Sequence, residues 1–218
     1  LRAQVLGVDL VRDERGGWVV LEDNLRIPSG LGYALSIRRL MDEVMPDLPR
    51  PPGLLDTAAA PGLLRAALIA SAHPDAREDP TLVLLSDGPG NSAWFEHRLL
   101  ADAAGLTVAS PRDLLVRDGW VVLTGDGAPR PVDVLYVRLD AHRIGDMIGA
   151  DGQPLGEQFW DVVESGRVAV ANAPGNGVAD DKAVYAYVPA LIEYYLHEAP
   201  LLRTARTYPC GDPEQREM

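Results

Sequence analysis

The sequence predicts a mixed α/β fold of the α+β kind, and three regions of the chain carry that prediction. Two apolar runs, residues 6–11 and 18–22, flank a glycine turn and are typical of a β-hairpin. Residues 81–104 read as a short apolar strand, a glycine turn and a helix, which is the opening of an α/β layer. We therefore expect residues 81–172 to form one α/β unit with a mainly parallel sheet and an inserted hairpin.

The opening hairpin is predicted to carry a metal-binding cluster. Gly16 and Gly17 supply the positive φ that a tight turn needs, so the two strands should be antiparallel neighbours. Side chains alternate between the faces of a strand, so Glu22 and Asn24 share one face, and the fold-back brings Asp9 close to them. Carboxylate and amide oxygens are ligands that Mg²⁺ takes together with phosphate and water. The alternative is a solvated hairpin whose acidic residues keep the edge soluble, but carboxylates beside core-facing residues favour the metal.

Two helices and a rigid connector are expected between the hairpin and the α/β unit. Apolar residues recur at helical spacing over residues 33–45, which predicts a helix directly after the hairpin. The proline-rich stretch 46–53 predicts a non-helical connector. The Ala- and Leu-rich stretch 54–71 predicts a second helix, and residues 72–80 predict a polar turn.

Within the α/β unit, the strand over residues 81–85 leads into a turn that holds Gly88 and Gly90. Asn91 and Ser92 stand where a helix N-cap is expected, before the helix over residues 94–104. The turn is neither a Walker loop nor a dinucleotide fingerprint, because no Gly-Lys-Ser or Gly-Lys-Thr follows it and the third glycine of the fingerprint is missing. Further strands are predicted over residues 106–109, 113–116, 120–124 and 132–139.

A last helix is predicted after the glycine–proline turn at residues 172–177. Asp180 and Asp181 stand at the start of this helix. Acids are common there, because they cap free N–H groups and interact favourably with the helix dipole. Lys182 is unusual there, since a cation in the first turn opposes the dipole. Beyond this helix, residues 200–210 read as the start of another strand.

Composition limits the classes of function. A formal net charge of −12 argues against a nucleic-acid partner, because such a surface needs clustered Lys and Arg. Cys210 is the single cysteine, which excludes an internal disulfide framework and a cysteine zinc cluster. No apolar run reaches the roughly 20 residues of a membrane span, and no signal-peptide pattern opens the chain, so we expect a cytoplasmic protein without a membrane partner. Composition does not indicate an oligomeric state.

Two further kinds of site find no support in the sequence. The histidines His73, His142 and His197 share no metal-ligand spacing, so we expect surface or structural roles for them. A hydrolase triad is not supported either, because the nucleophile elbow Gly-x-Ser-x-Gly does not occur.

Three motifs of this chain together resemble one family. They are Leu-Glu22-Asp-Asn24-Leu-Arg26-x-Pro28-Ser29-Gly30, Gly88-Pro-Gly-Asn91-Ser-x-x-Phe95-Glu96-His97 and Asn172-Ala-Pro-Gly-x-Gly177-Val-Ala-Asp180-Asp181-Lys182-Ala-Val-Tyr185. The chain resembles the circularly permuted ATP-grasp group of bacterial proteins, which is related in architecture to glutathionylspermidine synthase. In ordinary ATP-grasp enzymes the Glu-x-Asn element lies near the C-terminus, whereas here it opens the chain.

Arg138 lies in a segment that resembles only part of a family motif, Tyr-Arg-Arg-x-Asp-Asp. Val137 and Ala141 depart from that motif. A planar guanidinium suits a carboxylate or phosphate, so Arg138 is a candidate for contact with substrate or an acyl phosphate. The alternative is that Arg138 pairs with Asp140 or another acid.

The resemblance implies ATP and Mg²⁺ as cofactors and assigns roles to the candidate residues. The alternative for Glu96 and His97 is that they cap and pack the helix over residues 94–104 and contact no ligand. The implied sites are the metal ligands Asp9, Glu22 and Asn24; the nucleotide-binding residues Arg26, Asp181 and Lys182; the catalytic residues Arg26 and Arg138; and the acceptor-facing residues Asn91, Ser92, Glu96 and His97.

The resemblance also implies an ATP-dependent carboxylate–amine or carboxylate–thiol ligase that acts through an acyl phosphate on small-molecule or peptide substrates. The alternative is a non-catalytic module that keeps the scaffold and binds a ligand or partner. Because the chain lacks the family's strands that cover the nucleotide, we expect a fragment that is inactive by itself. The expected segments are a metal-binding core at 1–53, a helical connector at 54–80, a substrate domain at 81–172 and the start of the nucleotide-binding segment at 173–218.

Overall fold

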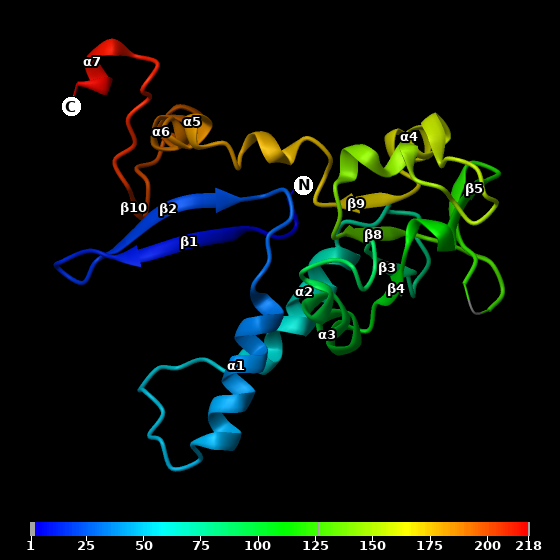
Figure 1. Cartoon of the computed structure of the whole chain (residues 1–218), viewed down its shortest axis with the longest axis horizontal. Coiled ribbons are helices and arrows are strands. Elements are labelled where there is room, and N and C mark those ends of the chain that lie inside the picture. The colour runs from blue at the N-terminus through cyan, green and yellow to red at the C-terminus, as the bar shows by residue number, and fades with distance from the viewer. Residues whose placement is uncertain (1–2, 126, 218) are drawn as a thin grey trace. The chain divides into compact units, whose positions relative to one another are not determined.

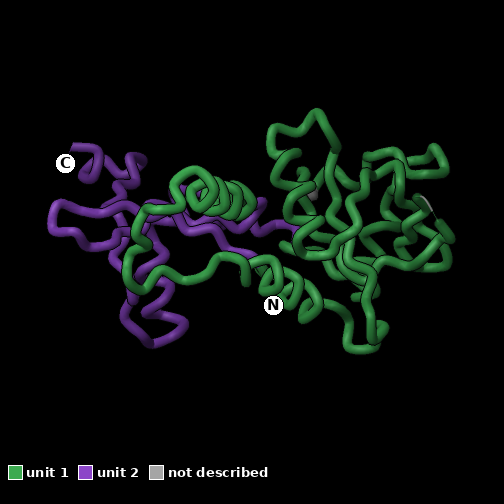
Figure 2. The backbone as a smooth tube through the Cα atoms, turned by 90° about the horizontal axis from the view of Figure 1, so that it is seen from below, with its two compact units in different colours: residues 1–4, 29–172 green, residues 5–28, 173–218 purple. Residues whose placement is uncertain are grey.

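The computed structural model describes residues 3–125 and 127–217. Two compact units divide the chain, and Figure 2 shows them in different colours. Unit 1 is formed by residues 1–4 and 29–172, and unit 2 by residues 5–28 and 173–218. The opening hairpin and the last part of the chain therefore fold together in unit 2. The four functional segments expected from the sequence stay a prediction, because compactness assigns no role to a segment.

Unit 2 is built on the predicted hairpin. Strands β1 (Gly7–Arg12) and β2 (Trp18–Asn24) pair antiparallel, which confirms the expected topology. A short strand, β10 (Arg203–Thr204), pairs parallel with β2. The turn is closed by the carboxylate of Asp13, whose Oδ1 accepts the N–H of Gly17 at 2.7 Å. Asp13 also forms an ion pair with Arg203, so β10 is fastened to the turn as well as to β2.

The helix expected at the end of the chain is broken into two pieces. Helix α5 spans Lys182–Tyr185 and α6 spans Val188–Leu196. Pro189 lies in the first turn of α6, where its missing N–H costs nothing, but it cannot continue the ladder of hydrogen bonds from α5. The remaining helical elements of unit 2 are a 3-10 turn at Asn176–Val178 and α7 at Pro213–Arg216.

Unit 1 contains the predicted parallel sheet. Its strands follow the order β4-β3-β8-β9, and every neighbouring pair is parallel, as can be followed in Figure 1. The central strands are almost wholly apolar and buried on both faces, as expected for strands of a covered parallel sheet. The strands are β3 (Leu82–Leu85), β4 (Thr107–Ala109), β8 (Val134–Val137) and β9 (Ala169–Ala171).

The inserted hairpin of unit 1 forms a second sheet. Asp118 and Gly119 both have positive φ, 53° and 72°, which closes a two-residue turn between the strands. Its apolar side chains join the core of the parallel sheet, where Leu114 and Val121 pack in one cluster with Val83. The strands of this sheet are β5 (Leu114–Arg117), β6 (Trp120–Leu123) and β7 (Arg130–Pro131).

The helices of unit 1 agree with the sequence in two places and differ in two. The first and third lie where they were predicted, within two residues. The second begins later than expected, because Pro61 is accepted only in the first turn of a helix. The fourth was not anticipated. The helices are α1 (Leu31–Val44), α2 (Ala60–Ile69), α3 (Trp94–Ala104) and α4 (Gly156–Glu164), with 3-10 turns at Thr57–Ala59, Pro111–Asp113 and Ala141–Asp146.

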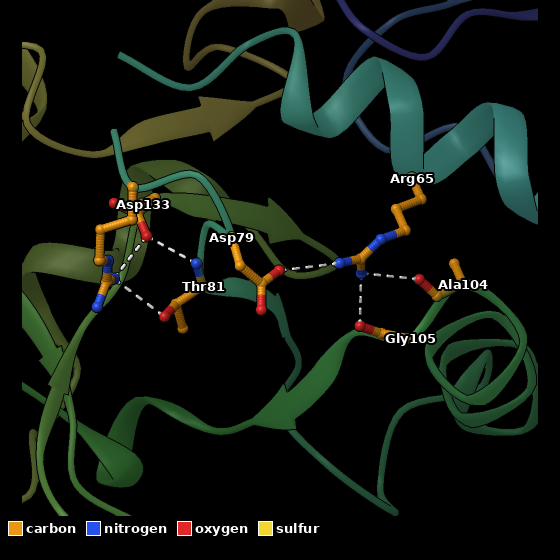
Figure 3. Close-up of polar contacts among 7 residues, drawn as sticks. Arg65, Asp79, Thr81, Ala104, Gly105 and Asp133 are labelled. Carbon is orange, nitrogen blue, oxygen red and sulfur yellow. Dashed lines mark hydrogen bonds and ion pairs between the residues drawn. The ribbon is translucent and has the colours of Figure 1, made fainter. Parts of the chain in front are cut away.

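Polar contacts fasten the elements of unit 1 to one another, and Figure 3 shows those around Arg65 and Asp133. Arg65 of α2 donates to the carbonyl oxygens of Ala104 and Gly105, at 3.2 and 2.9 Å, and so satisfies the C-terminal end of α3. Asp133, just before β8, accepts the N–H of Thr81 at 2.6 Å and thereby joins the starts of two sheet strands.

Within the described part of the chain, no helix has the length and apolar character required to traverse a membrane.

Candidate functional site

The hairpin of unit 2 brings the three predicted metal ligands together. Asp9 lies directly opposite Glu22, and Asn24 lies opposite Gly7 at the same end of the strand pair. The amide Nδ2 of Asn24 donates to Oδ1 of Asp9 at 3.4 Å. The register shifts between Asp9 and Leu10, because Leu21 of β2 has no counterpart in β1, and this shift is what places Asp9 opposite Glu22. The Asp9 carboxylate is exposed and that of Glu22 is half-buried, which leaves both accessible to a ligand.

Lys182 is joined to the same cluster. Its ammonium group forms an ion pair with the carboxylate of Glu22. It is the only lysine among the 218 residues of the chain, and its side chain is 72% exposed. Asp181 precedes it as the N-cap of α5 and accepts the N–H of Ala183 at 2.7 Å. The structure thus gives Asp181 a capping contact, and its predicted contact with the nucleotide stays a prediction.

Arg26 follows the metal ligands in the loop after β2, and the main chain of this loop is held by a residue that is not among the predicted site residues. The N–H groups of Leu25 and Arg26 both donate to the carboxylate of Asp180. The Arg26 side chain is exposed and passes over Gly177, where an added Cβ would lie 3.0 Å from the arginine Cδ. The sequence predicts that Asp180 caps a helix start, but Asp180 lies one residue before the N-cap of α5, and this place in the sequence is the signal that it has another partner.

The oxygen atoms that the hairpin offers suit a hard cation whose remaining coordination positions are filled by other ligands. Among the described residues, no group of three or more His, Cys, Asp and Glu side chains is arranged to hold a metal ion by itself. Asp9, Glu22 and Asn24 offer two carboxylates and one amide oxygen instead. Mg²⁺ is commonly held by one or two carboxylates together with phosphate oxygens and water, so this set fits a magnesium–nucleotide complex better than bare metal.

A second polar cluster, in unit 1, is centred on Glu96. This carboxylate is fully buried. Its Oε1 accepts the N–H groups of Gly30 and Gly32 at 2.7 and 2.9 Å, at the first turn of α1. Its Oε2 lies 3.4 Å from the guanidinium of Arg138, whose side chain is also buried. Glu96 therefore caps α1, lies in the first turn of α3 and neutralises the buried arginine.

His97 and Tyr136 complete this buried cluster. Nδ1 of His97 lies 2.9 Å from the hydroxyl of Ser86, and the Tyr136 hydroxyl lies 3.5 Å from Arg138. Burial, and next the charge of Arg138, lower the pKa of His97, so the imidazole is neutral near pH 7. Burial raises the pKa of Tyr136.

The candidate residues of unit 1 therefore divide into buried and accessible ones. Glu96, His97 and Arg138 are at most 2% exposed, which matches the capping and ion-pair alternatives; a contact with substrate stays a prediction. The predicted N-cap at residues 91–92 is wrong, because α3 begins at Trp94 with Ala93 as its N-cap. Asn91 instead braces the preceding turn, since its side chain accepts the N–H of Ala93 at 2.8 Å and donates to Asp87 at 2.7 Å. Ser92 is exposed in the same turn, after β3.

Comparison with known proteins decides the family. A family model described as "Circularly permuted ATP-grasp type 2" matches residues 1–218. The chain belongs to the circularly permuted ATP-grasp type 2 family. The resemblance inferred from the sequence is thereby confirmed, and so is the fold class that it implies.

Relatives of this ATP-grasp chain are longer proteins. A Frankia alni protein named "Putative glutamate--cysteine ligase 2-3" is 50% identical over 217 residues, and the match covers 100% of this chain and 25% of that protein. A Frankia casuarinae protein named "Putative glutamate--cysteine ligase 2-2" is 50% identical over 218 residues, again with 25% of its length covered. An uncharacterized protein of Synechocystis is 44% identical over 213 residues, 97% of this chain and 44% of that protein. The chain thus spans a quarter of the length of the Frankia relatives.

Proposed function

We propose that this chain is the magnesium- and phosphate-binding part of an ATP-dependent ligase that joins a carboxylate to an amine or a thiol. The observation that carries the proposal is the cluster at the end of the hairpin, where Asp9, Glu22 and Asn24 meet and Lys182 pairs with Glu22. Membership of the ATP-grasp family supports ATP and Mg²⁺ as the cofactors. The whole protein's substrates are small-molecule or peptide carboxylates and amines.

In the proposed reaction, a substrate carboxylate oxygen attacks the γ-phosphorus of ATP, the bond to the β,γ-bridging oxygen breaks, and ADP leaves. The amine or thiol then attacks the acyl carbon and displaces inorganic phosphate. Asp9, Glu22 and Asn24 would hold the magnesium ion, which neutralises charge on the phosphates when bound. Arg26 and Lys182 would bind phosphate oxygens through charge-assisted hydrogen bonds, with Asp181 fixing the start of the lysine's helix.

Unit 1 would supply the acceptor side of the reaction. The Asn91–Ser92 turn follows the carboxyl end of a parallel strand, the edge at which open α/β sheets bind ligands. Arg138, with Glu96 and His97, would shape that region from within, because all three are buried. The names of the Frankia relatives favour glutamate as the carboxylate and cysteine as the amine.

The second candidate function is a non-catalytic module that keeps this scaffold and binds a ligand or partner. The exposed Glu22–Lys182 ion pair is compatible with it, since the pair satisfies both charges without a nucleotide. A cytoplasmic location and the lack of a nucleic-acid partner stay predictions from composition.

Calorimetric titration of ATP into the whole natural protein, with and without Mg²⁺, tests the proposal. We expect magnesium-dependent binding that both Glu22→Ala and Asn24→Ala abolish, while the exposed Glu157→Ala in α4 leaves it unchanged. Phosphate release on addition of glutamate and cysteine then separates a ligase from a binding module. Absence of ATP binding by the wild type, or binding by both variants that is as tight as that of the wild type, would overturn the ligase proposal.

A further inference from the structure

Asp180 holds the backbone of the loop that follows β2. Its Oδ1 accepts the N–H of Leu25 at 2.6 Å, and the N–H of Arg26 lies 3.2 Å from each of its carboxylate oxygens. Hydrogen bonds to an ionised acceptor are about twice as strong as those between neutral groups. Two successive amides are thus tied to one carboxylate, which fixes the direction in which the loop leaves the strand.

The same segment also supports the Arg26 side chain. An added Cβ at Gly177 would stand 3.0 Å from Cδ and 3.6 Å from Cγ of Arg26, so the aliphatic part of the arginine lies over bare backbone. Gly177 supports the side chain of Arg26 while Asp180 holds its main chain. The two contacts are independent, because one is made by a carboxylate and the other by the absence of a side chain.

The segment is in turn fixed to the hairpin. Tyr185 is buried and its hydroxyl donates to the carbonyl oxygen of Val20, while Lys182 pairs with Glu22. Residues 180–185 therefore contact β2 and the loop after it at three points. Asp180 is therefore held at a defined place relative to the predicted metal ligands. Its hydrogen bonds to the loop then fix the main chain of Arg26 relative to the same ligands.

We propose that Asp180 is the positioning residue of the phosphate-binding site, which orients Arg26 relative to Glu22 and Asn24. The proposal rests on the proposed function, in which Arg26 contacts a phosphate. Without the carboxylate, the loop has more conformations, and the guanidinium reaches the phosphate in only a fraction of them. A ligand that needs a partly populated arrangement binds more weakly by that fraction.

A double-mutant cycle on ATP binding by the whole natural protein, measured calorimetrically with Mg²⁺, tests this role. We expect Asp180→Ala to weaken binding about tenfold, the effect of a competent population of roughly one tenth. In the Arg26→Ala background the same change should weaken binding by less than about twofold, because a positioning residue acts only through its partner. Asp180→Asn keeps one acceptor oxygen and should fall between the wild type and Asp180→Ala.

Two further variants make the test specific. Asp212→Ala is the matched control: it removes another carboxylate of unit 2 that accepts a backbone N–H, that of Glu214 at 3.0 Å, and should bind ATP like the wild type. Gly177→Ala displaces the Arg26 side chain and leaves the Asp180 carboxylate in place. It should weaken binding in the wild type but not in the Arg26→Ala background, which shows that the placement of Arg26 matters. Asp180→Asn, measured in both backgrounds, decides the role of Asp180 if Asp180→Ala does not fold.

The outcomes separate this inference from the proposed function. The positioning role would be overturned if Asp180→Ala bound ATP as tightly as the wild type. It would also be overturned if Asp180→Ala weakened binding by the same factor in the Arg26→Ala background as in the wild type. If Arg26→Ala binds like the wild type while Glu22→Ala does not, the positioning role is wrong and the proposed function stands. If the wild type ignores ATP, the proposed function fails and this inference fails with it.

Discussion

The carboxylate of Glu22 is paired with the ammonium group of Lys182, a residue 160 positions further along the chain. In the proposed function these two side chains have different ligands, a magnesium ion and a phosphate. The lysine therefore occupies the carboxylate that a metal would need. Binding of a magnesium–nucleotide complex would exchange this one ion pair for two new contacts, metal to Glu22 and phosphate to Lys182.

Removing the lysine charge should affect metal and nucleotide in opposite directions. Lys182→Gln should strengthen binding of Mn²⁺ alone about two- to fivefold, because an exposed ion pair contributes at most about 1 kcal/mol. The same change should weaken binding of ATP with Mg²⁺. Spin-resonance titration of free Mn²⁺ and calorimetry measure the two affinities. Lys182→Arg, which keeps the charge, is the control, and weaker Mn²⁺ binding by Lys182→Gln would contradict the competition.

Loss of the buried carboxylate of Glu96 should destabilise the protein strongly. Glu96→Ala leaves the guanidinium of Arg138 buried without this carboxylate and removes the cap on α1. We expect the free energy of unfolding to fall by about 3–5 kcal/mol, measured by urea denaturation. The control is Glu157→Ala, because Glu157 is exposed in the first turn of α4. This change should alter the free energy of unfolding by less than about 0.5 kcal/mol. Equal effects of the two changes would show that the Glu96 cluster does not stabilise the fold.

Two glycine-to-alanine changes should have opposite signs. At Gly32 an added Cβ would lie 2.8 Å from Cγ of Glu96, so Gly32→Ala should destabilise the protein by about 1–3 kcal/mol through overpacking. Gly62 lies in α2 with nothing within 4 Å of an added Cβ, and Gly62→Ala should stabilise by about 0.5–1 kcal/mol. Thermal unfolding of both variants checks the prediction. A stabilised Gly32→Ala variant would mean that α1 and α3 can separate at this point.

His97 should make stability depend on pH between about 7 and 5. Burial and Arg138 lower its pKa, with Glu96 and Asp87 acting in the opposite sense, so in this range the unfolded chain binds more protons than the folded one. Stability is then full above the ordinary histidine pKa of about 6.5 and falls as pH decreases, by at most about 1.4 kcal/mol per pH unit.

Urea unfolding of the wild type and His97→Gln at several pH values measures this dependence. The advantage of the wild type over the variant should shrink as pH falls. The exposed His142→Gln variant controls for the loss of one imidazole. A difference between the wild type and His97→Gln that stays constant with pH would contradict the prediction.

Local sequence pattern determined several elements by itself. The hairpin of β1 and β2, the bounds of α3 and the parallel sheet all follow from alternation, glycine turns and helical spacing, which act between near neighbours in the chain. The three predicted metal ligands also come together for a local reason. The turn sets Leu10 opposite Val20, and the register shift between Asp9 and Leu10 then places Asp9, instead of Val8, opposite Glu22.

Elements with weak local signals were decided by tertiary structure. Helix α4 has only nine residues, and its helical form depends on burying Phe159 and Val162 in the core of unit 1. The break between α5 and α6 has a local cause instead, Pro189, although the apolar spacing of the segment predicted one continuous helix.

The polar partners of the candidate residues were also beyond the sequence. Glu96 meets Arg138 across 42 positions of the chain, and Asp180 meets Leu25 across 155. Alternation and helical spacing repeat over a few residues and carry no information about encounters at such separations. The residue type alone shows that a buried carboxylate needs hydrogen-bonding or charged partners. Only the packing of strands and helices decides which amides and which arginine are those partners.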